Sequence, residues 1–591
     1  MEEKVTTKPK ADKPRGFYCL LTAAVVVSGI AVFVGLSEHK TSSSLELPWW
    51  KTTIIYQVYP RSFKDSDGDG IGDIKGIISK LDYFVYLNIK ALWLSPFYKS
   101  PMADFGYDIS NHTDVDSIFG SLEDVDQLIE EAHARGIRII IDFVPNHTSD
   151  KHVWFEKSLQ NDDKYKDYYI WADDIVTSGG SRKPPNNWLS VFSGSAWTWN
   201  ENRSQFYYHA FLTKQPDLNF RNTDVIDDMK GVLRFWLERG VDGIRVDALQ
   251  KLFEVTDLSL NEPPSNAKEY HEHQYNYLNH PYTESLPETF EVVTRWKDVM
   301  NEFENKDGIS RFMVIETYEQ PSQRNIYYDH GAVPYNFDLI MDVTSECGGL
   351  CIRDVLEKEY SNLPPGAWPT FVLGNHDRNR VSKKFGLEFV NVYNMLLLTL
   401  WGTPTTYYGE ELGMEEIQVS FEDTQDPQGL KQGKEYYAEF SRDPCRSPMQ
   451  WTSSVQSGFS TSPTPWLPVH GHYRTVNVEV QKNSKSLSPL QLYRKLAFLR
   501  EHPSFQTGSL QYVVVNKNIL SYVRGSDGEG RFLVAMNFGH KTSTDNYSIH
   551  PVNTEKGTVV VTTSSLNSEE KNTRSLKDIS LLPGSGIIIK L

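Results

Sequence analysis

The sequence predicts an α/β protein built on a (β/α)8 TIM barrel, with an inserted subdomain after the third strand and a C-terminal antiparallel β-domain. Eight β-branched or aromatic runs alternate with helix-like stretches. The gap after the third run is too long for one helix and is rich in Gly, Pro, Asn and Trp. After about residue 500 the pattern changes to short strands and turns. Alternating strands and helices are typical of a parallel sheet, and strands buried on both faces favour a closed barrel.

The eight strand-like runs are short and apolar, as expected for strands covered on both faces. In chain order they are IIYQVY (54–59), ALWLSP (91–96), RIIIDFV (138–144), GIRVDAL (243–249), RFMVIE (311–316), NFDLIM (336–341), PTFVLGNHD (369–377) and TPTTYYGEEL (403–412). The stretches SLEDVDQLIEEAHARG (121–136) and VIDDMKGVLRFWLERG (225–240) place apolar residues three or four apart. That spacing predicts helices with one buried face.

The N-terminal segment predicts a membrane anchor. Residues 17–36 carry no charge, and as a helix they would span about 30 Å, the thickness of a bilayer's hydrocarbon core. Lysines and an arginine precede this stretch, so the positive-inside rule keeps the tail cytoplasmic. We expect a single-pass type II plasma-membrane protein with the barrel outside the cell. A secreted protein released from a signal peptide is the alternative, although such peptides have shorter apolar runs.

These patterns divide the chain into six parts. They are a cytoplasmic tail (1–16), a transmembrane anchor (17–36), a stalk (37–48), the barrel (49–147 and 222–500), the inserted subdomain (148–221) and the C-terminal β-domain (501–591).

Composition excludes nucleic acid as a partner, because a net charge of -17 leaves no excess of cations to neutralise phosphates. The expected partners are a small-molecule substrate and, through the anchor, the membrane. An extracellular location permits disulfides and glycans. Cys347 and Cys351 either close a small loop or remain buried thiols, and the sequons at Asn111, Asn202 and Asn546 predict glycosylation.

Charged residues end several of the predicted strands. Asp247 follows Arg245 in GIRVDA, Glu316 ends VIE, and Asp377 follows His376 in LGNHD. In such barrels the active site lies at the carboxyl ends of the strands, so these three carboxylates should meet at one mouth. Two neighbouring carboxyl groups, one ionised and one protonated, are what glycoside cleavage with retention needs.

The surroundings of each carboxylate predict its role. Arg245 lies two residues before Asp247, on the same face of the strand, and should lower the pKa of Asp247 so that it acts as an anionic nucleophile. Glu316 follows an apolar strand, where desolvation favours the protonated form of a general acid. Asp377 is then left to bind the sugar hydroxyls in the transition state.

Six motifs in a fixed order resemble glycoside hydrolase family 13, in particular its oligosaccharide-acting α-glucosidases, which include insect gut maltases and sucrases. They are DFVPNH (142–147), QPDLN (215–219), GIRVDALQ (243–250), VIETY (314–318), LGNHD (373–377) and SRDPCRSPMQW (441–451). The resemblance runs from about Trp49 to the C-terminus. It implies Asp247 as nucleophile, Glu316 as acid/base and Asp377 as transition-state stabiliser. Further residues that the resemblance places around the same sugar are His147, Arg245 and His376.

The resemblance also implies a clamp on the terminal sugar. An Asp–Arg pair and a stacking Tyr map onto Asp104, Tyr107 and either Arg442 or Arg446. Such a clamp makes a blind pocket, from which a single terminal glucose is removed. Relatives that act on α-1,6 bonds usually carry Val after the nucleophile, whereas this chain has Ala248, which favours α-1,4 bonds or sucrose.

A second site is predicted in KDSDGDGIGD. Asp65, Asp67, Asp69 and Asp73 alternate with glycines, and the Ile71 carbonyl completes a set of oxygen ligands suited to Ca²⁺. The alternative is a solvated acidic turn, but four carboxylates so close together repel one another without a cation. Relatives carry calcium in this loop, so the resemblance also implies a structural Ca²⁺.

The expected activity is therefore that of a retaining, exo-acting α-glucosidase on sucrose or maltose-type α-glucosides, with transfer of glucose to water or to another sugar. A heavy-chain-like, non-catalytic subunit of an amino-acid transporter is the alternative, because such subunits share the tail, anchor and glycosidase-like ectodomain. They link to their partner through a Cys just outside the membrane, and no Cys lies between Cys19 and Cys347. They also lose catalytic residues that this chain keeps.

Overall fold

The computed structural model describes residues 47–591 except 177–180, 526–527, 529 and 564–569. The chain separates into two units, 1–48 and 49–591, and the second carries the fold described below. The predicted tail (1–16) and anchor (17–36) lie outside the described residues. Within the described ranges, no helix has the length and apolarity that crossing a bilayer requires.

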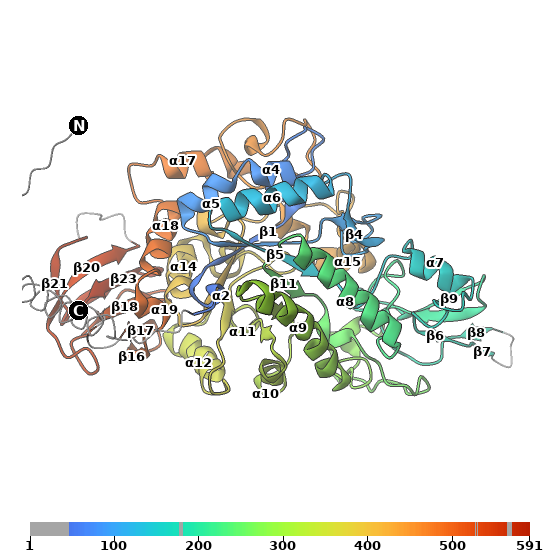
Figure 1. Ribbon diagram of the computed structural model, residues 1–591. Helices are drawn as coiled ribbons and strands as arrows, with labels where there is room; N and C mark the ends of the chain where they lie inside the picture. Colours follow the sequence, from blue (N-terminus) through green and yellow to red (C-terminus); the bar gives the residue numbers. More distant parts are fainter. Residues whose placement is uncertain (1–46, 177–180, 526–527, 529, 564–569) are drawn as a thin grey trace, which may run out of the picture. The chain divides into compact units, whose positions relative to one another are not determined.

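Eight parallel strands form the central sheet, which confirms the predicted barrel (Figure 1). The sheet order is β13-β12-β11-β5-β2-β1-β15-β14, so strands that follow one another in the chain are neighbours in space. The strands are β1 (Ile55–Val58), β2 (Ala91–Leu94), β5 (Arg138–Phe143), β11 (Gly243–Val246), β12 (Phe312–Ile315), β13 (Val333–Pro334), β14 (Thr370–Val372) and β15 (Thr403–Tyr407).

A side chain links the two strands at the ends of this order, β13 and β14. The Thr370 hydroxyl donates to the carbonyl of Pro334 at 3.0 Å and accepts the N–H of Asn336 at 3.1 Å. No backbone ladder pairs β13 with β14 in the described sheet, so the hydroxyl supplies a link between them. These two bonds close the ring of strands.

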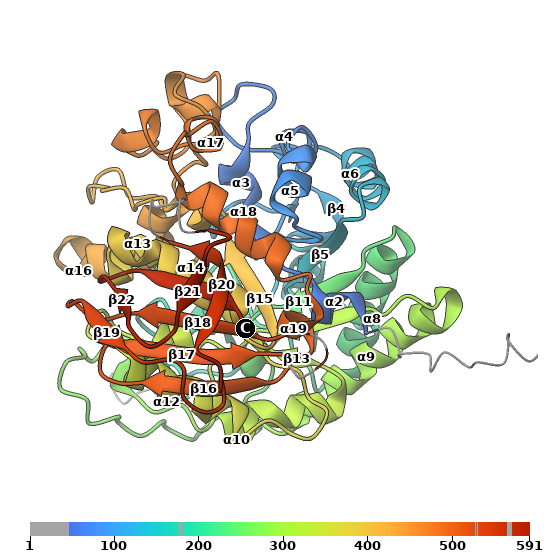
Figure 2. The same ribbon diagram turned by 90° about the vertical axis from the view of Figure 1, so that its left-hand side faces the viewer.

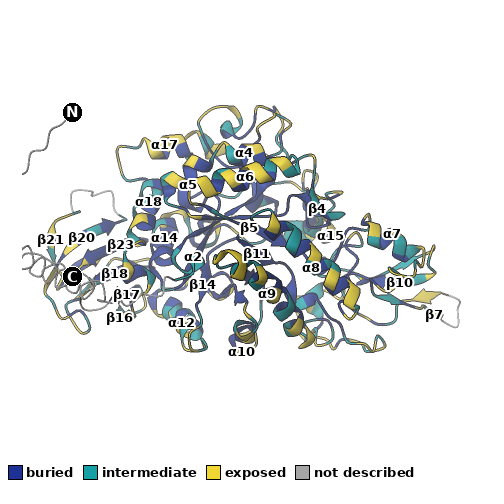
Figure 3. Ribbon diagram, in the orientation of Figure 1, coloured by how far each residue is buried: buried dark blue, intermediate teal, exposed yellow. Residues whose placement is uncertain are grey.

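Helices surround the barrel, and their exposed faces point away from the buried strands (Figure 3). The main helices between the strands are α5 (Leu81–Leu87), α6 (Leu122–Ala134), α8 (Thr223–Glu238), α9 (Glu288–Asp307), α12 (Gly349–Tyr360) and α14 (Val390–Thr399), and α18 (Pro489–Leu499) follows the last strand. Both helices predicted from apolar spacing are present, as α6 and α8. Ser121 and Asp124 form a capping box at the start of α6.

The predicted sixth strand, NFDLIM (336–341), is wrong. The strand is the preceding pair of residues in β13, and residues Asp338–Met341 form the short helix α11. The Asn336 side chain accepts the N–H of Asp338 at 2.8 Å and so turns the chain. A short run in which four of six residues are apolar does not distinguish a strand from a buried helical turn.

The segment between β5 and α8 forms a small layer of its own, at the position predicted for the insert. It contains the helix α7 (Val153–Leu159), the hairpin β7 (Ile175–Val176) and β8 (Arg182–Lys183), and an antiparallel sheet of order β6-β10-β9. That sheet consists of β6 (Trp171–Ala172), β9 (Trp197–Asn200) and β10 (Gln205–Tyr208). Trp188, Trp197 and Tyr208 pack in its own apolar cluster.

The C-terminal β-domain is confirmed as an antiparallel sheet of order β16-β17-β18-β23-β20-β21 (Figure 2). Its strands are β16 (Leu510–Val515), β17 (Ile519–Arg524), β18 (Phe532–Asn537), β20 (Lys556–Thr562), β21 (Thr573–Ser575) and β23 (Gly586–Lys590), with β19 (Ser543–Asp545) and β22 (Ile579–Leu581) as a separate pair. Arg524 donates to the Thr399 carbonyl at the end of α14, and the Tyr522 and Thr399 hydroxyls are 2.6 Å apart. Buried polar contacts therefore fix this sheet to the barrel.

Cys347 and Cys351 form a disulfide at the start of α12, which settles the choice that the sequence left open. Cys445 is a free, buried thiol.

We predict that Thr370→Val destabilises the barrel, because the buried N–H of Asn336 and the carbonyl of Pro334 lose their partner. The expected loss in the free energy of unfolding is about 1–3 kcal/mol, measured by chemical denaturation. Thr405→Val is the matched control, since the Thr405 hydroxyl makes a long 3.5 Å contact with Tyr335. Equal losses for the two variants would contradict a role of Thr370 in closing the barrel.

Candidate active site

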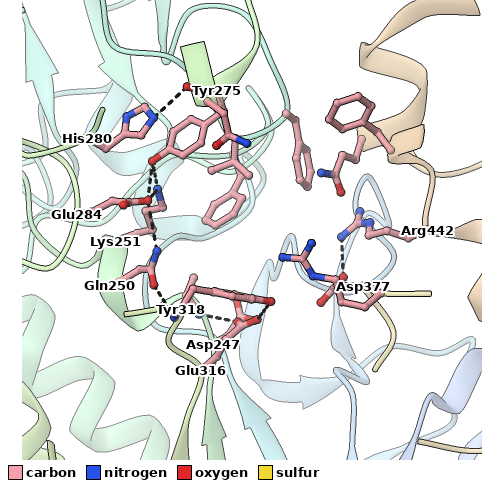
Figure 4. Close-up of a pocket in the computed structure, with 18 of the residues that line it drawn as sticks. Asp247, Gln250, Lys251, Tyr275, His280, Glu284, Glu316, Tyr318, Asp377 and Arg442 are labelled. Carbon is pink, nitrogen blue, oxygen red and sulfur yellow. Dashed lines mark hydrogen bonds and ion pairs between the residues drawn. The ribbon is translucent and has the colours of Figure 1, made fainter. Parts of the chain in front are cut away.

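A cavity of about 840 Å³ lies at the carboxyl ends of the barrel strands (Figure 4). Eight of the residues predicted for the site line this cavity: Asp104, Tyr107, His147, Asp247, Glu316, His376, Asp377 and Arg442. The structure thus brings together side chains that are up to about 340 residues apart in the chain. Arg245 and Arg446 are 1% and 0% exposed and lie behind the cavity wall.

Arg245 binds three carboxylates at once. Its Nη1 contacts Asp142 Oδ1 at 2.9 Å and Asp247 Oδ1 at 2.5 Å, and its Nη2 contacts Glu316 Oε2 at 2.8 Å. Strands β5, β11 and β12 are neighbours, so their carboxyl ends deliver the three acids to one guanidinium. Asp247 and Glu316 consequently lie side by side at the base of the cavity (Figure 4).

Arg245 acts on the pKa of Asp247 in the predicted direction, but the predicted net lowering, which would keep Asp247 anionic, is wrong for the free protein. Burial raises the pKa of Asp247 well above its ordinary value, Arg245 opposes this, and the neighbouring carboxylates Glu316, Asp142 and Asp377 add to the increase. Burial likewise raises the pKa of Asp142 to about 6 against the attraction of Arg245. Three carboxylates share one positive charge, so the cluster favours retaining a proton near neutral pH.

Ala248, the residue after Asp247, has a left-handed backbone with φ of 48°. This conformation directs its N–H to Glu316 Oε2 at 3.3 Å. The Tyr318 hydroxyl donates to Glu316 Oε1 at 3.2 Å, so both oxygens of Glu316 are oriented. A β-branched side chain would be strained at a positive φ, which gives a physical reason for a small residue here.

Asp377 has a different electrostatic environment. Burial alone would raise the pKa of Asp377, but His376, Arg442 and Arg446 lower it well below its ordinary value. Arg446 Nη2 lies 2.9 Å and Arg442 Nη1 3.2 Å from Asp377 Oδ1. Asp377 is therefore ionised, whereas the Arg245 cluster holds a proton.

His376 is held as a neutral ring between three partners. Burial lowers the pKa of His376 to about 3. Gln57 Nε2 donates to its Nδ1 at 2.8 Å, which leaves the proton on Nε2, 3.2 Å from Asp377 Oδ2. The Tyr107 hydroxyl lies 2.6 Å from the same Nε2 and donates to Asp142 at 2.9 Å. Tyr107 therefore connects the Asp377 side of the cavity with the Arg245 cluster.

Arg442, and not Arg446, forms the predicted pair with Asp104. Arg442 Nη2 contacts Asp104 Oδ1 at 2.7 Å, and Asp426 holds the same guanidinium with contacts of 2.6 and 3.0 Å. Assigning Arg446 to substrate binding does not fit its position, because it is fully buried and its Nε donates to the His376 carbonyl at 2.7 Å. Its role in the structure is to hold Asp377.

His147 lies beside this pair. Burial lowers the pKa of His147 to about 3, so the ring is neutral. Its Nε2 is 3.1 Å from both the Tyr107 carbonyl and Gln215 Nε2, and Gln215 also donates to Asp104 at 3.2 Å.

The wall opposite the clamp was not predicted. Lys251 and Glu284 form a 2.5 Å ion pair, and the Tyr275 hydroxyl donates to Glu284 at 2.8 Å (Figure 4). Phe192 of the insert also lines the cavity, 5.1 Å from the Arg442 guanidinium. Tyr275 and Glu284 come from a polar, turn-rich segment without a recognisable spacing, so no sequence signal identifies them, whereas Lys251 directly follows GIRVDALQ (243–250).

The acidic loop brings together three of its four aspartates. Carboxylate oxygens of Asp65, Asp67 and Asp73 lie within 4.8 Å of one another, whereas Asp69 is not part of this group. Burial raises the pKa of Asp69, the N–H of Ile71 lowers it, and the surrounding aspartates raise it further. Clustered carboxylate oxygens are the kind of ligand that fits a hard cation such as Ca²⁺.

The three predicted sequons lie on accessible chain. Asn202 and Asn546 are exposed, and Asn111 is half-buried in β4 (Asn111–Val115).

Comparisons with known proteins agree with this geometry. Residues 57–508 match the family described as "Alpha amylase, catalytic domain", and residues 512–589 match "Alpha amylase, C-terminal all-beta domain". An α-glucosidase of Apis mellifera is 45% identical over 83% of this chain and 85% of its own length. An amino acid transporter heavy chain of Homo sapiens is 39% identical over 90% of this chain and 76% of its own length.

Among solved structures, the crystal structure of an α-glucosyl transfer enzyme is similar with a TM-score of 0.81 and 34% identity. That match covers 92% of this chain and 100% of the other. The two family matches follow the barrel and the C-terminal sheet in order, and together they span most of the described residues. The chain therefore belongs to the α-amylase family of glycoside hydrolases, in agreement with its resemblance to glycoside hydrolase family 13.

Proposed function

We propose that the protein is a retaining, exo-acting α-glucosidase that releases terminal glucose from sucrose and maltose-type α-glucosides. One observation carries the proposal: Asp247 and Glu316 share the Arg245 guanidinium at the base of one cavity. A nucleophile and an acid/base placed side by side suit a double displacement, in which a glycosyl-enzyme intermediate forms and is then released.

The charges around the cavity support a division of roles. Asp247 attacks the anomeric carbon, and Glu316 gives its proton to the departing oxygen and later takes one from the acceptor. The three carboxylates around Arg245 favour retaining one proton, and departure of the leaving group consumes a proton. Asp377, kept ionised by Arg442 and Arg446, accepts hydrogen bonds from the sugar hydroxyls, and these bonds strengthen as positive charge develops on the ring.

The Asp104–Arg442 pair supports exo action. It stands beside Asp377, and Asp426 fixes its guanidinium, so the polar groups are oriented before the sugar arrives. Ala248 leaves room next to the nucleophile, which supports α-1,4 bonds or sucrose. The relatives include an α-glucosidase and an α-glucosyl transfer enzyme, which supports transfer of glucose to water or to another sugar.

The alternative function has a relative in its favour, the human transporter heavy chain. Against it stands the complete set of Arg245, Asp247, Glu316, His376 and Asp377 around the cavity of this chain. A subunit that only chaperones a transporter has no need of two oriented carboxyl groups in a cavity.

The activity is tested by incubating the purified protein with sucrose, maltose and isomaltose and following glucose release. We expect hydrolysis of sucrose or maltose, and a loss of roughly a thousandfold or more in Asp247→Asn, because the variant has no anionic nucleophile. Asp163→Asn is the control, since that carboxylate is fully exposed outside the cavity. Wild-type rates in Asp247→Asn would exclude Asp247 as the nucleophile, and a purified protein without hydrolysis would favour the transporter role.

We further propose that Ca²⁺ binds in the 65–73 loop and has a structural role. The loop packs on the 459–466 segment, where the Ser460 hydroxyl donates to Asp65 Oδ2 at 2.5 Å and Trp466 N–H donates to the Gly70 carbonyl at 3.0 Å. A cation there would relieve repulsion among the aspartates. Asp65, Asp67 and Asp73 are the carboxylates already grouped to hold it; Asp69 and the Ile71 carbonyl remain predicted ligands.

Chelation should lower the melting temperature, and added Ca²⁺ should restore it, because the cation binds only the folded loop. Asp67→Asn keeps a side-chain acceptor for the Asp69 N–H but removes a charge, so it should weaken this response. Asp163→Asn should leave it unchanged. A melting temperature that does not respond to chelation and calcium would count against the site.

We propose that the protein is anchored in the plasma membrane as a type II protein, with the barrel outside and glycans at Asn111, Asn202 and Asn546. The uncharged stretch 17–36 and the preceding cations support this orientation. A secreted form is the alternative.

Detergent should be required to release the activity from membranes, because a spanning helix is held by its apolar surface. A variant that begins at Pro48 after a cleavable signal peptide is the control and should appear in the soluble fraction. Recovery of the full-length protein without detergent, with an N-terminus beyond residue 36, would identify the secreted form instead.

A further inference from the structure

A cluster of two histidines and a glutamate lies outside the cavity. Glu415 follows the short helix η5 (Glu410–Leu412), and His470 and His472 stand at the start of η8 (Gly471–Arg474). One ligand atom from each of the three side chains lies within 4.8 Å of the other two. Among the described residues, this is the only such group that contains histidine.

The three side chains already face one another. His472 Nδ1 lies 3.0 Å from Glu415 Oε1, and the two imidazole rings are 4.8 Å apart at an angle of 82°. In a tetrahedral site with bonds of about 2.0–2.1 Å, two ligand atoms are separated by roughly 3.3 Å. A metal ion could therefore take the place of the hydrogen that His472 and Glu415 now share, with small side-chain movements.

Both segments of the cluster are fixed by other bonds. Glu416, next to Glu415, accepts the N–H of Arg380 at 2.7 Å, and the Ile417 N–H donates to the Pro444 carbonyl at 3.2 Å. The His472 carbonyl accepts the N–H of Val476 at 3.0 Å. The backbone that carries the ligands is thus held in place before a metal arrives, which lowers the entropic cost of binding.

We propose that Glu415, His470 and His472 form a binding site for Zn²⁺ or a similar borderline divalent cation. Two imidazoles and one carboxylate are typical zinc ligands, whereas Ca²⁺ prefers a set of oxygens such as the acidic loop offers. His472 is exposed and Glu415 and His470 are partly exposed, so the ion has access and water can fill the fourth position.

The site would connect two segments that are distant in the sequence. Glu416 links the Glu415 side to Arg380, which lies three residues after Asp377. Zinc would therefore stabilise the chain next to the cavity without contacting the cavity. This inference does not depend on the proposed activity.

The test uses the full-length protein, freed of metals with a chelator and returned to excess Ca²⁺ so that the acidic loop is saturated. Zinc is then titrated by calorimetry, and the bound metal is counted by elemental analysis. We expect about one zinc ion per chain and a melting temperature that rises with zinc concentration.

The variants are His472→Ala and His470→Asn. In the wild type, His470 Nδ1 accepts the backbone N–H of His472 at 3.2 Å and so caps η8. An asparagine at position 470 can still accept this N–H, so His470→Asn removes the metal ligand but keeps the cap. Each variant should weaken zinc binding by about tenfold or more, since a ligand is lost. His273→Ala is the matched control, because His273 is an exposed histidine outside the cluster, and it should bind zinc like the unaltered protein.

Two results would overturn the site. One is a metal-free protein that takes up no zinc in the presence of Ca²⁺. The other is unchanged zinc affinity in both His472→Ala and His470→Asn, which would place any bound zinc elsewhere. The melting temperature of each metal-free variant is compared with that of the metal-free wild type. Equal values show that the variant has lost a ligand and not its fold.

Discussion

The buried guanidinium of Arg245 organises the catalytic end of the barrel. It lies between strands whose carboxyl ends carry Asp142, Asp247 and Glu316, and it contacts all three acids. Removal of one partner from a buried ion pair costs about 3–5 kcal/mol, because an unpaired charge is left without water. The same contacts that hold the strand ends together therefore also position the two carboxyl groups that the proposed reaction uses.

The excess of acids over the single cation has a chemical consequence. Ionisation of all three carboxylates around one arginine is unfavourable because the negative charges repel one another. This side of the cavity therefore favours retaining a proton. On the other side two arginines surround Asp377 and keep it ionised. One wall of the cavity has three carboxylates for one arginine and favours a proton. The other has two arginines around one carboxylate, which is ionised. Tyr107 and His376 connect the two regions as neutral hydrogen-bonding groups.

Much of the architecture could be predicted from short-range patterns. Apolar runs identified seven of the eight barrel strands, while NFDLIM failed because a short, mostly apolar run fits either a strand or a helical turn. The carboxylates at strand ends could be predicted because parallel strands present their carboxyl ends at one mouth. The pKa of Asp247 could not, because the sequence shows the neighbouring Arg245 but hides the two other acids that share it.

The sequence by itself determined the barrel, the C-terminal sheet and the residues that face the mouth, since these follow from side-chain periodicity and strand direction along the chain. Tertiary structure alone decided which arginine pairs with Asp104, how Lys251 and Glu284 build the opposite wall, and which three aspartates gather in the acidic loop. The physical reason is distance: charges and hydrogen bonds act between side chains that the fold brings within about 4 Å, whatever their separation in the sequence.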